Sequence, residues 1–145
     1  MISIALLSIK VAVVATIISL PLAIAIGWIL GKKNFKGKTI LETLVSLPLA
    51  LPPVATGYFL LLLLGREGAV GKLFATFFDF DIVFTWGAAS IAAAIVSFPL
   101  MVRPIVVSMA SVDVTLERSS LVLGAGKIKT FLSITLPLSY KGILG

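Results

Sequence analysis

Few side chains in this sequence could take part in catalysis or bind a metal. The 145 residues contain no histidine and no cysteine, and only 6 are aspartate or glutamate. These absences exclude thiolate nucleophiles, histidine bases, disulfide frameworks and the usual zinc sites. The few carboxylates are scattered along the chain, so we expect no metal site. The remaining candidates are neutral hydroxyls, prolines, glycines and basic side chains.

One glycine-rich stretch, at residues 65–73, has some features of a phosphate-binding loop. A P-loop carries two glycines five residues apart, followed by lysine and then serine or threonine. Here Gly65 and Gly71 are six residues apart, and Leu73 stands in the hydroxyl position after Lys72. We therefore expect no nucleotide binding at this stretch and interpret it as a turn between helices.

Another group of candidates combines hydroxyls with prolines in an apolar run. Each proline removes a backbone donor and clashes with the preceding turn, so a helix through this run should kink or break. In a membrane, broken backbone is tolerated only where protein or a water-filled cavity covers it. Neutral hydroxyls suit a path for an anion that must not be held tightly, although a single hydroxyl more often bonds back to its own helix. The candidate path or gate residues are Ser46, Pro48, Pro52, Pro53 and Thr56 in this run, and Ser90 and Ser97 in the next one.

The elements that must position these residues are long apolar helices. Apolar residues make up 59% of the chain and charged residues 12%, whereas a typical soluble domain carries about 25% charged residues. A helix needs about 20 residues to cross the hydrocarbon core of a bilayer. Three runs without a charge meet that length, at residues 11–31, 43–65 and 82–102. We predict an all-α membrane protein with spans at about 4–31, 43–65 and 82–103.

The first run has two further features. A cleaved signal peptide is the alternative reading, but the apolar stretch is too long and lacks a basic segment before it. Ala23, Gly27 and Gly31 recur every four residues on one helix face, which would let another helix approach closely. The alternative is that these small residues face lipid. Lys10 lies near the start of the run, where its ammonium can extend to the headgroups.

Basic residues are distributed unevenly between the connections. Residues 32–38 hold four lysines and no acid, and five basic residues follow the third charge-free run, at residues 103–141. In contrast, residues 66–81 hold two basic residues and three acids. Cytoplasmic loops collect lysine and arginine. We therefore predict that the N-terminus and the loop 66–81 lie outside and that the region 108–141 is cytoplasmic. The net charge of +6 then reflects orientation, and no nucleic-acid partner is expected.

The tail beyond residue 108 is more polar than the spans. Residues 114–121 fit a short amphipathic helix that Gly124 would end, and a second helical piece from Lys127 leads to Leu136 and Pro137. Two short helices around a glycine hinge are typical of a docking element. An ordinary solvated connector is the alternative.

The motif Glu117-Arg118-Ser119-Ser120-Leu121-Val122-Leu123-Gly124, followed by Ile134-Thr135-Leu136-Pro137, resembles the cytoplasmic signature loop of permease subunits of binding-protein-dependent ABC importers. That loop has a Glu-Ala-Ala core, a glycine and an Ile-x-Leu-Pro ending, and in the family it forms the coupling helix that fits a groove on the ATPase subunit. Here the glycine and the ending match in spacing, whereas Ser119 and Ser120 stand where the two alanines fall. The resemblance implies an ATPase-coupling role for Glu117, Arg118, Ser119, Ser120, Gly124, Ile134, Leu136 and Pro137.

The resemblance extends through all 145 residues, and the subfamily that the sequence most resembles is that of the molybdate-type permeases. Sulfate and tungstate permeases share much of this pattern, so these anions remain alternatives. The motifs that carry it are Leu47-Pro48-Leu49, Leu51-Pro52-Pro53-Val54, Gly65-Arg66-Glu67-Gly68 and Phe98-Pro99-Leu100-Met101-Val102-Arg103. It implies the transmembrane-domain fold of type I ABC importers, with three spans and the coupling-helix loop of a larger bundle.

The resemblance also implies a function and partners. The chain would be a multi-pass permease in the plasma membrane of a prokaryote and would itself be neither an enzyme nor a cofactor-binding protein. A second permease copy would pair with it, an ABC ATPase subunit would hydrolyse ATP, and a soluble oxyanion-binding protein would dock outside. Because family members continue with further spans, we expect residues 1–145 to be a single incomplete permease domain. The alternatives of another class are a small three-helix membrane scaffold and a non-functional permease fragment.

Overall fold

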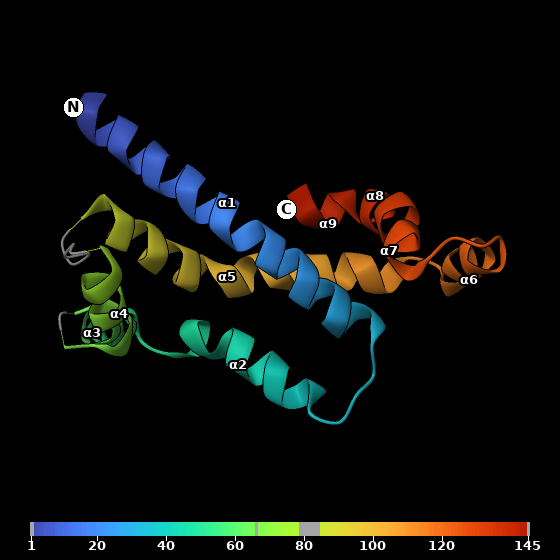
Figure 1. Cartoon of the computed structure of the whole chain (residues 1–145), viewed down its shortest axis with the longest axis horizontal. Helices are drawn as coiled ribbons and strands as arrows, with labels where there is room; N and C mark the ends of the chain where they lie inside the picture. Colours follow the sequence, from blue (N-terminus) through green and yellow to red (C-terminus); the bar gives the residue numbers. More distant parts are fainter. Residues whose placement is uncertain (1, 66, 79–84, 145) are drawn as a thin grey trace. The chain divides into compact units, whose positions relative to one another are not determined.

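The computed structural model describes residues 2–65, 67–78 and 85–144, and every regular element within these ranges is helical. The predicted all-α class is therefore confirmed. Arg66, Asp79 and Asp81 of the predicted external loop, and residues 82–84 of the predicted third span, lie outside the described residues. In chain order, the elements are α1 (Ile2–Lys32), α2 (Lys38–Ala50), α3 (Pro53–Leu64), α4 (Ala69–Phe78), α5 (Trp86–Ser111), α6 (Val114–Val122), α7 (Lys127–Thr130), the π-helical turn η1 (Phe131–Thr135), α8 (Leu136–Leu138) and α9 (Tyr140–Leu144) (Figure 1).

Among the described residues, three helical segments are long and apolar enough to cross a membrane, judged by length and composition. They are Ser3–Lys32, Val54–Leu73 and Trp86–Ser111. The predicted run 43–65 is divided between α2 and α3, so the second of these segments begins after the division and continues into α4. The connection predicted at 66–81 thus contains a helix, because residues 69–78 are mostly apolar and include no proline.

The division between α2 and α3 lies at the predicted proline cluster. Pro52 adopts an extended backbone, with φ −56° and ψ 140°, and Pro53 takes the first position of α3. Proline suits that position because the first backbone N–H of a helix has no partner in any case. Pro48 lies inside α2, which continues past it. The sequence-based prediction of a kink or break is therefore confirmed at residues 51–52.

The chain divides into two compact units. The first unit comprises Met1–Ser19 and Val45–Pro99, and the second comprises Leu20–Leu44 and Leu100–Gly145. In the first unit, the ammonium of Lys10 lies over the ring of Trp86, 3.8 Å from its centroid. A cation over an aromatic face is attracted by the negative potential of the ring, so this contact joins the N-terminal part of α1 to the start of α5.

In the second unit, the end of α1 crosses the second half of α5 along the predicted face of small residues. Ala23 is fully buried. A Cβ atom on Gly27 would collide with the side chain of Ile105, and one on Gly31 would lie 2.9 Å from the carbonyl oxygen of Val106. Because only glycine permits this approach, the small residues form a helix–helix contact, as predicted, and do not face lipid.

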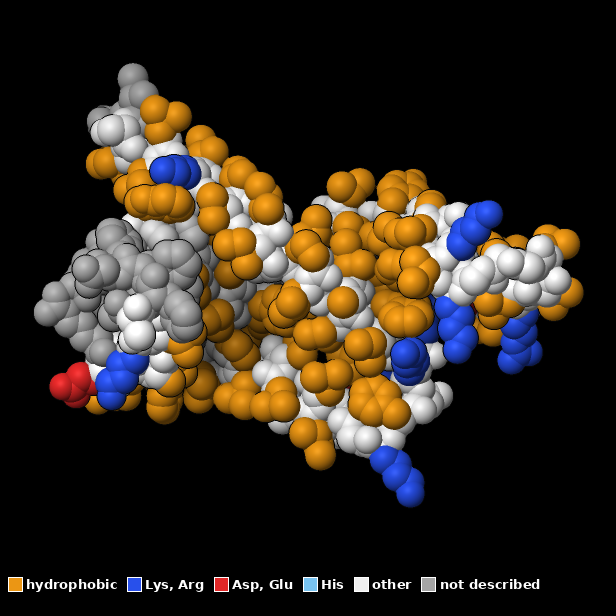
Figure 2. Space-filling model, viewed as in Figure 1, with side chains coloured by type: hydrophobic (Ala, Val, Ile, Leu, Met, Phe, Trp, Pro, Cys, Tyr) orange, Lys and Arg blue, Asp and Glu red, His pale blue; other side chains and the backbone are white. Residues whose placement is uncertain are grey.

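Much of the surface of both units is apolar. In Figure 2, hydrophobic side chains cover most of the visible face of the helices. Examples are Ile17, Val54 and Val107, whose side chains are 65%, 85% and 69% exposed. Exposed apolar surface on this scale is costly in water and is expected where helices face lipid or further protein.

Candidate functional site

The predicted coupling helix is α6, and its ends are fixed by two local features. At its start, Asp113 accepts a hydrogen bond from the backbone N–H of Thr115 at 2.8 Å, the usual capping arrangement. This hydrogen bond, followed by one from the side chain of Thr115, lowers the pKa of Asp113. Beyond its end, Gly124 has a φ of +87°, a conformation that other L-residues adopt only with strain. The sequence therefore sets both the start and the end of the helix.

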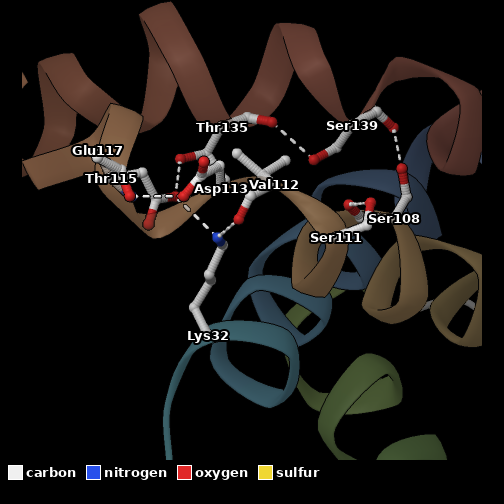
Figure 3. A network of polar contacts seen from close by, with 9 residues as sticks. All are labelled: Lys32, Ser108, Ser111, Val112, Asp113, Thr115, Glu117, Thr135 and Ser139. Carbon is white, nitrogen blue, oxygen red and sulfur yellow. Dashed lines mark hydrogen bonds and ion pairs between the residues drawn. The ribbon is translucent and has the colours of Figure 1, made fainter.

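An ion pair joins α6 to the end of α1 (Figure 3). The ammonium of Lys32 lies 3.3 Å from Oε1 of Glu117 and donates a hydrogen bond of 2.6 Å to the carbonyl oxygen of Val112. The same carboxylate oxygen accepts a hydrogen bond of 2.5 Å from the hydroxyl of Thr135 in η1. The side chains of Lys32 and Glu117 are only 10% and 17% exposed, so solvent screens this pair less than it screens a surface pair.

Further hydroxyls extend this polar network. The hydroxyls of Ser120 in α6 and Thr130 in α7 are 3.0 Å apart, within hydrogen-bond distance. The buried Ser139 donates to the carbonyl of Thr135, and Ser108 of α5 donates to the carbonyl of Ser139 (Figure 3). Together these bonds link α6, the segment from α7 to α8, and α5.

A groove of about 510 Å³ opens between α6 and the following segment. We call it the α6 groove, and it is lined by Leu116, Ser119, Ser120, Leu123, Gly124, Ala125, Lys129 and Ile134. Lysine and arginine side chains, blue in Figure 2, gather at the end of the second unit that carries α6 and α7. The lining of the groove thus combines apolar side chains with two hydroxyls and the lysine Lys129.

The structure brings together some of the predicted coupling residues. Ser119, Ser120, Gly124 and Ile134 all line the α6 groove. The remaining four do not line it. Glu117 is engaged in the internal network, Arg118 is exposed on α6, Leu136 is partly buried at the start of α8, and Pro137 is exposed beside it.

The predicted path residues all belong to the first unit. Thr56 is buried and donates to the carbonyl of Pro52, Ser90 is buried and donates to that of Trp86, and Ser97 donates to that of Ala93. These bonds within one helix are the commoner fate noted above for a single hydroxyl. Ser46 is partly buried in α2, the same helix that contains Pro48.

A separate groove of about 380 Å³ lies between α3 and the start of α5. Its lining contains no predicted path residue and consists of Gly57, Leu60, Leu61, Leu64, Thr85, Ala88, Ala89 and Ala92. This lining is almost entirely apolar, so it offers an anion few hydrogen-bond donors.

Several residues that contact the predicted coupling helix or line its groove were not among the sequence-predicted site residues. In the sequence, Lys32 indicates only orientation, and Thr135 occupies only the variable position of the Ile-x-Leu-Pro ending. The spacing of Leu116 and Leu123, seven residues apart, could have indicated that they share one helix face. No comparable signal links Lys32 to Glu117, because residues so distant in sequence are paired only by the tertiary fold.

Residues 23–145 match the model of the family described as binding-protein-dependent transport system inner membrane component. The chain is 45% identical over 138 residues to the molybdenum transport system permease protein ModB of Haemophilus influenzae, covering 95% of this chain and 60% of that protein. It is 38% identical to the putative molybdenum transport system permease protein YvgM of Bacillus subtilis, covering 95% and 61%.

A more distant relative is the probable sulfate transport system permease protein cysT of Helicosporidium sp. subsp. Simulium jonesii. It is 34% identical over 138 residues, covering 95% of this chain and 51% of that protein. The chain spans about 60% of the length of the molybdenum permeases that it matches. Because the family model covers most of the chain, this protein belongs to the family of inner membrane components of binding-protein-dependent transport systems.

Proposed function

We propose that this chain is part of the transmembrane permease subunit of an ABC importer that moves molybdate into the cytoplasm. The observation that carries the proposal is the higher identity to a molybdenum permease, 45%, than to a sulfate permease, 34%, over the same length of chain. Sulfate and tungstate are the alternative substrates. ATP would be hydrolysed by a separate subunit, and this chain would bind no cofactor.

The proposed mechanism assigns separate tasks to the two units. In the second unit, the ATPase subunit would dock on the α6 groove, where four of the predicted coupling residues lie. In the first unit, the interruption at Pro52 and the hydroxyls of Ser46, Thr56, Ser90 and Ser97 would shape the path or its gate. Two permease copies would rock between inward-open and outward-open states as the ATPases close.

The orientation belongs to the same proposal. The lysine-rich connection between α1 and α2 and the coupling region 108–141 would face the cytoplasm, following the positive-inside rule. The N-terminus would lie outside, and a soluble oxyanion-binding protein would deliver its cargo to the outer surface of the permease.

The decisive experiment is a transport assay with the full-length permease. The permease is reconstituted in liposomes with its ATPase, and binding protein loaded with radiolabelled molybdate, tungstate or sulfate is supplied outside. We expect molybdate uptake that requires both ATP and the binding protein. Uptake of sulfate without molybdate would reassign the substrate, and an assembled complex that moves no oxyanion would favour the scaffold reading.

A further inference from the structure

We propose that Lys32 is a positioning residue that holds the coupling helix α6 to the end of the first span. The expected effect on transport rests on the proposed function. The contact itself is formed within this chain and does not depend on that function. Neither the family signature nor the predicted coupling residues include Lys32.

The geometry gives Lys32 a central place in the second unit. It is the last residue of α1, and its ammonium meets both the carboxylate of Glu117 and the carbonyl of Val112, which follows the end of α5. Thr135 in η1 holds the same carboxylate from another side. One ammonium and one carboxylate therefore join α1, the α5–α6 connection, α6 and η1 (Figure 3).

The lack of apolar anchorage on α6 makes this contact important. None of the residues of α6 is buried, and Val122 and the adjoining Leu123 are 86% and 87% exposed. A helix usually keeps its place by burying an apolar face. Since α6 does not, its place relative to α1 depends on specific polar contacts, of which the Lys32–Glu117 pair is the charged one among the described residues.

The pair also differs from an exposed ion pair. Two exposed charges on long side chains stabilise a fold little, whereas removing one partner of a buried, hydrogen-bonded pair leaves the other charge uncompensated. Both side chains here are mostly buried. Glu117 would therefore transmit a displacement of α6 to the end of α1, and docking contacts would come from the groove residues beside it.

The contact is tested first by hydrogen exchange of the full-length permease in nanodiscs. Lys32→Met should speed amide exchange in residues 114–122 by about tenfold or more, since the helix loses an anchor. Lys32→Arg keeps a cation and should stay near the wild type. Lys36→Met is the matched control, because Lys36 is an exposed lysine of the following loop with no ion pair among the described residues.

Positioning is then separated from general stability by measuring coupling. In the reconstituted importer, we expect Lys32→Met to lower the transport-to-hydrolysis ratio several-fold while the ATPase still assembles with the permease. Lys32→Arg should restore the ratio. Glu117→Gln should act through the same contact, so the double variant with Lys32→Met should be no worse than either single variant.

The outcomes distinguish this inference from the proposed function. If Lys32→Met matches Lys36→Met in both exchange and coupling, or if the effects of Lys32→Met and Glu117→Gln simply add, the positioning role is overturned. If Lys32→Met does not yield folded protein, the exchange of Glu117→Gln against Lys36→Met decides in its place. If exchange changes as expected but the wild-type complex moves no molybdate, the substrate assignment fails and the contact stands.

Discussion

At the scale of single residues, the predicted coupling region is defined by a cap, a glycine and a buried charge. Asp113 starts α6 by accepting a backbone hydrogen bond, and Gly124 follows its end in a left-handed conformation. Lys32 then attaches the helix to α1 through Glu117. Each feature depends on one side chain or its absence, so each can be tested by a single substitution.

The cap at Asp113 predicts a pH dependence. Hydrogen bonds from Thr115 lower the pKa of Asp113 below its usual value of 3.8. A carboxylate with a depressed pKa stabilises the fold above its unfolded-state pKa, and this stabilisation is lost as the pH falls through the lowered value. We expect the carboxyl carbon shift of Asp113 to titrate below 3.8, with the protection of the Thr115 amide, measured against its intrinsic exchange rate, falling over the same range.

Asp113→Asn is the control for this titration. Asparagine can cap a helix through its amide oxygen but carries no proton to titrate. Its Thr115 amide should therefore show no step in this pH range beyond the intrinsic change in exchange rate. A pKa of Asp113 at or above its usual value would contradict the capping interpretation.

Replacing Gly124 with alanine should lower the free energy of unfolding through backbone strain and not through steric crowding. A Cβ atom added there would meet nothing within 4 Å, yet the φ of +87° is unfavourable for alanine. Gly124→Ala should lower the free energy of unfolding by about 1–2 kcal/mol. Gly126→Ala, at φ −69°, should change it by less than about 0.5 kcal/mol. Denaturant titration of both variants in detergent would show the difference, and equal effects would argue against strain at Gly124.

At the scale of elements, the contact of α1 with α5 in the second unit requires glycine on α1. At Gly31 an added Cβ would press on the backbone of Val106, which cannot move aside as a flexible side chain can. In contrast, Gly57 in α3 has open space around it. The same substitution should therefore be destabilising at Gly31 but not at Gly57.

Gly31→Ala is predicted to destabilise the permease by about 1–3 kcal/mol through overpacking. Gly57→Ala should be neutral or stabilise it by up to about 1 kcal/mol, because alanine is the better helix former. The measurement is the thermal unfolding midpoint of each variant in the same detergent. Equal unfolding temperatures for the two variants would contradict the close contact of α1 with α5 at Gly31.

The elements were largely predictable from sequence, whereas the contacts between them were not. Run length predicted long apolar helices, the three prolines predicted the interruption at Pro52, and the four-residue repeat of small residues predicted the contact face of α1. Helix α4 was missed because Gly65 and Gly71 suggested a turn. The Lys32–Glu117 pair was missed because local patterns carry no information about which distant residues meet.

The candidate site was also predictable only in part, because a local motif does not show which distant residues meet. The spacing of the motif predicts a coupling role for Gly124 and Ile134, and both residues line the α6 groove. The motif could not show that Glu117 is engaged internally, since that depends on where α1 ends. Likewise, the hydroxyls of Ser90 and Ser97 were visible in the sequence, but their bonds to their own helix depend on rotamers.

At the scale of the whole molecule, the distribution of charge predicts how the chain crosses the membrane. Nine of the twelve basic residues fall in the connection 32–38 or in residues 103–141. Cytoplasmic connections collect such residues. The loop that contains Asn34 should therefore face the cytoplasm, and the end of α4 that contains Thr76 should lie on the outer side.

Single-cysteine labelling tests this orientation, because residues 1–145 contain no native cysteine. Asn34 and Thr76 are both exposed, in the α1–α2 connection and in α4. In a full-length permease with no other cysteine, a membrane-impermeant maleimide should label Thr76→Cys in intact cells. It should label Asn34→Cys only after the membrane is permeabilised, because the positive-inside rule retains that lysine-rich loop in the cytoplasm. The reverse pattern would place the predicted coupling region on the outer side, where it could not meet a cytoplasmic ATPase subunit, and would overturn the proposed mechanism.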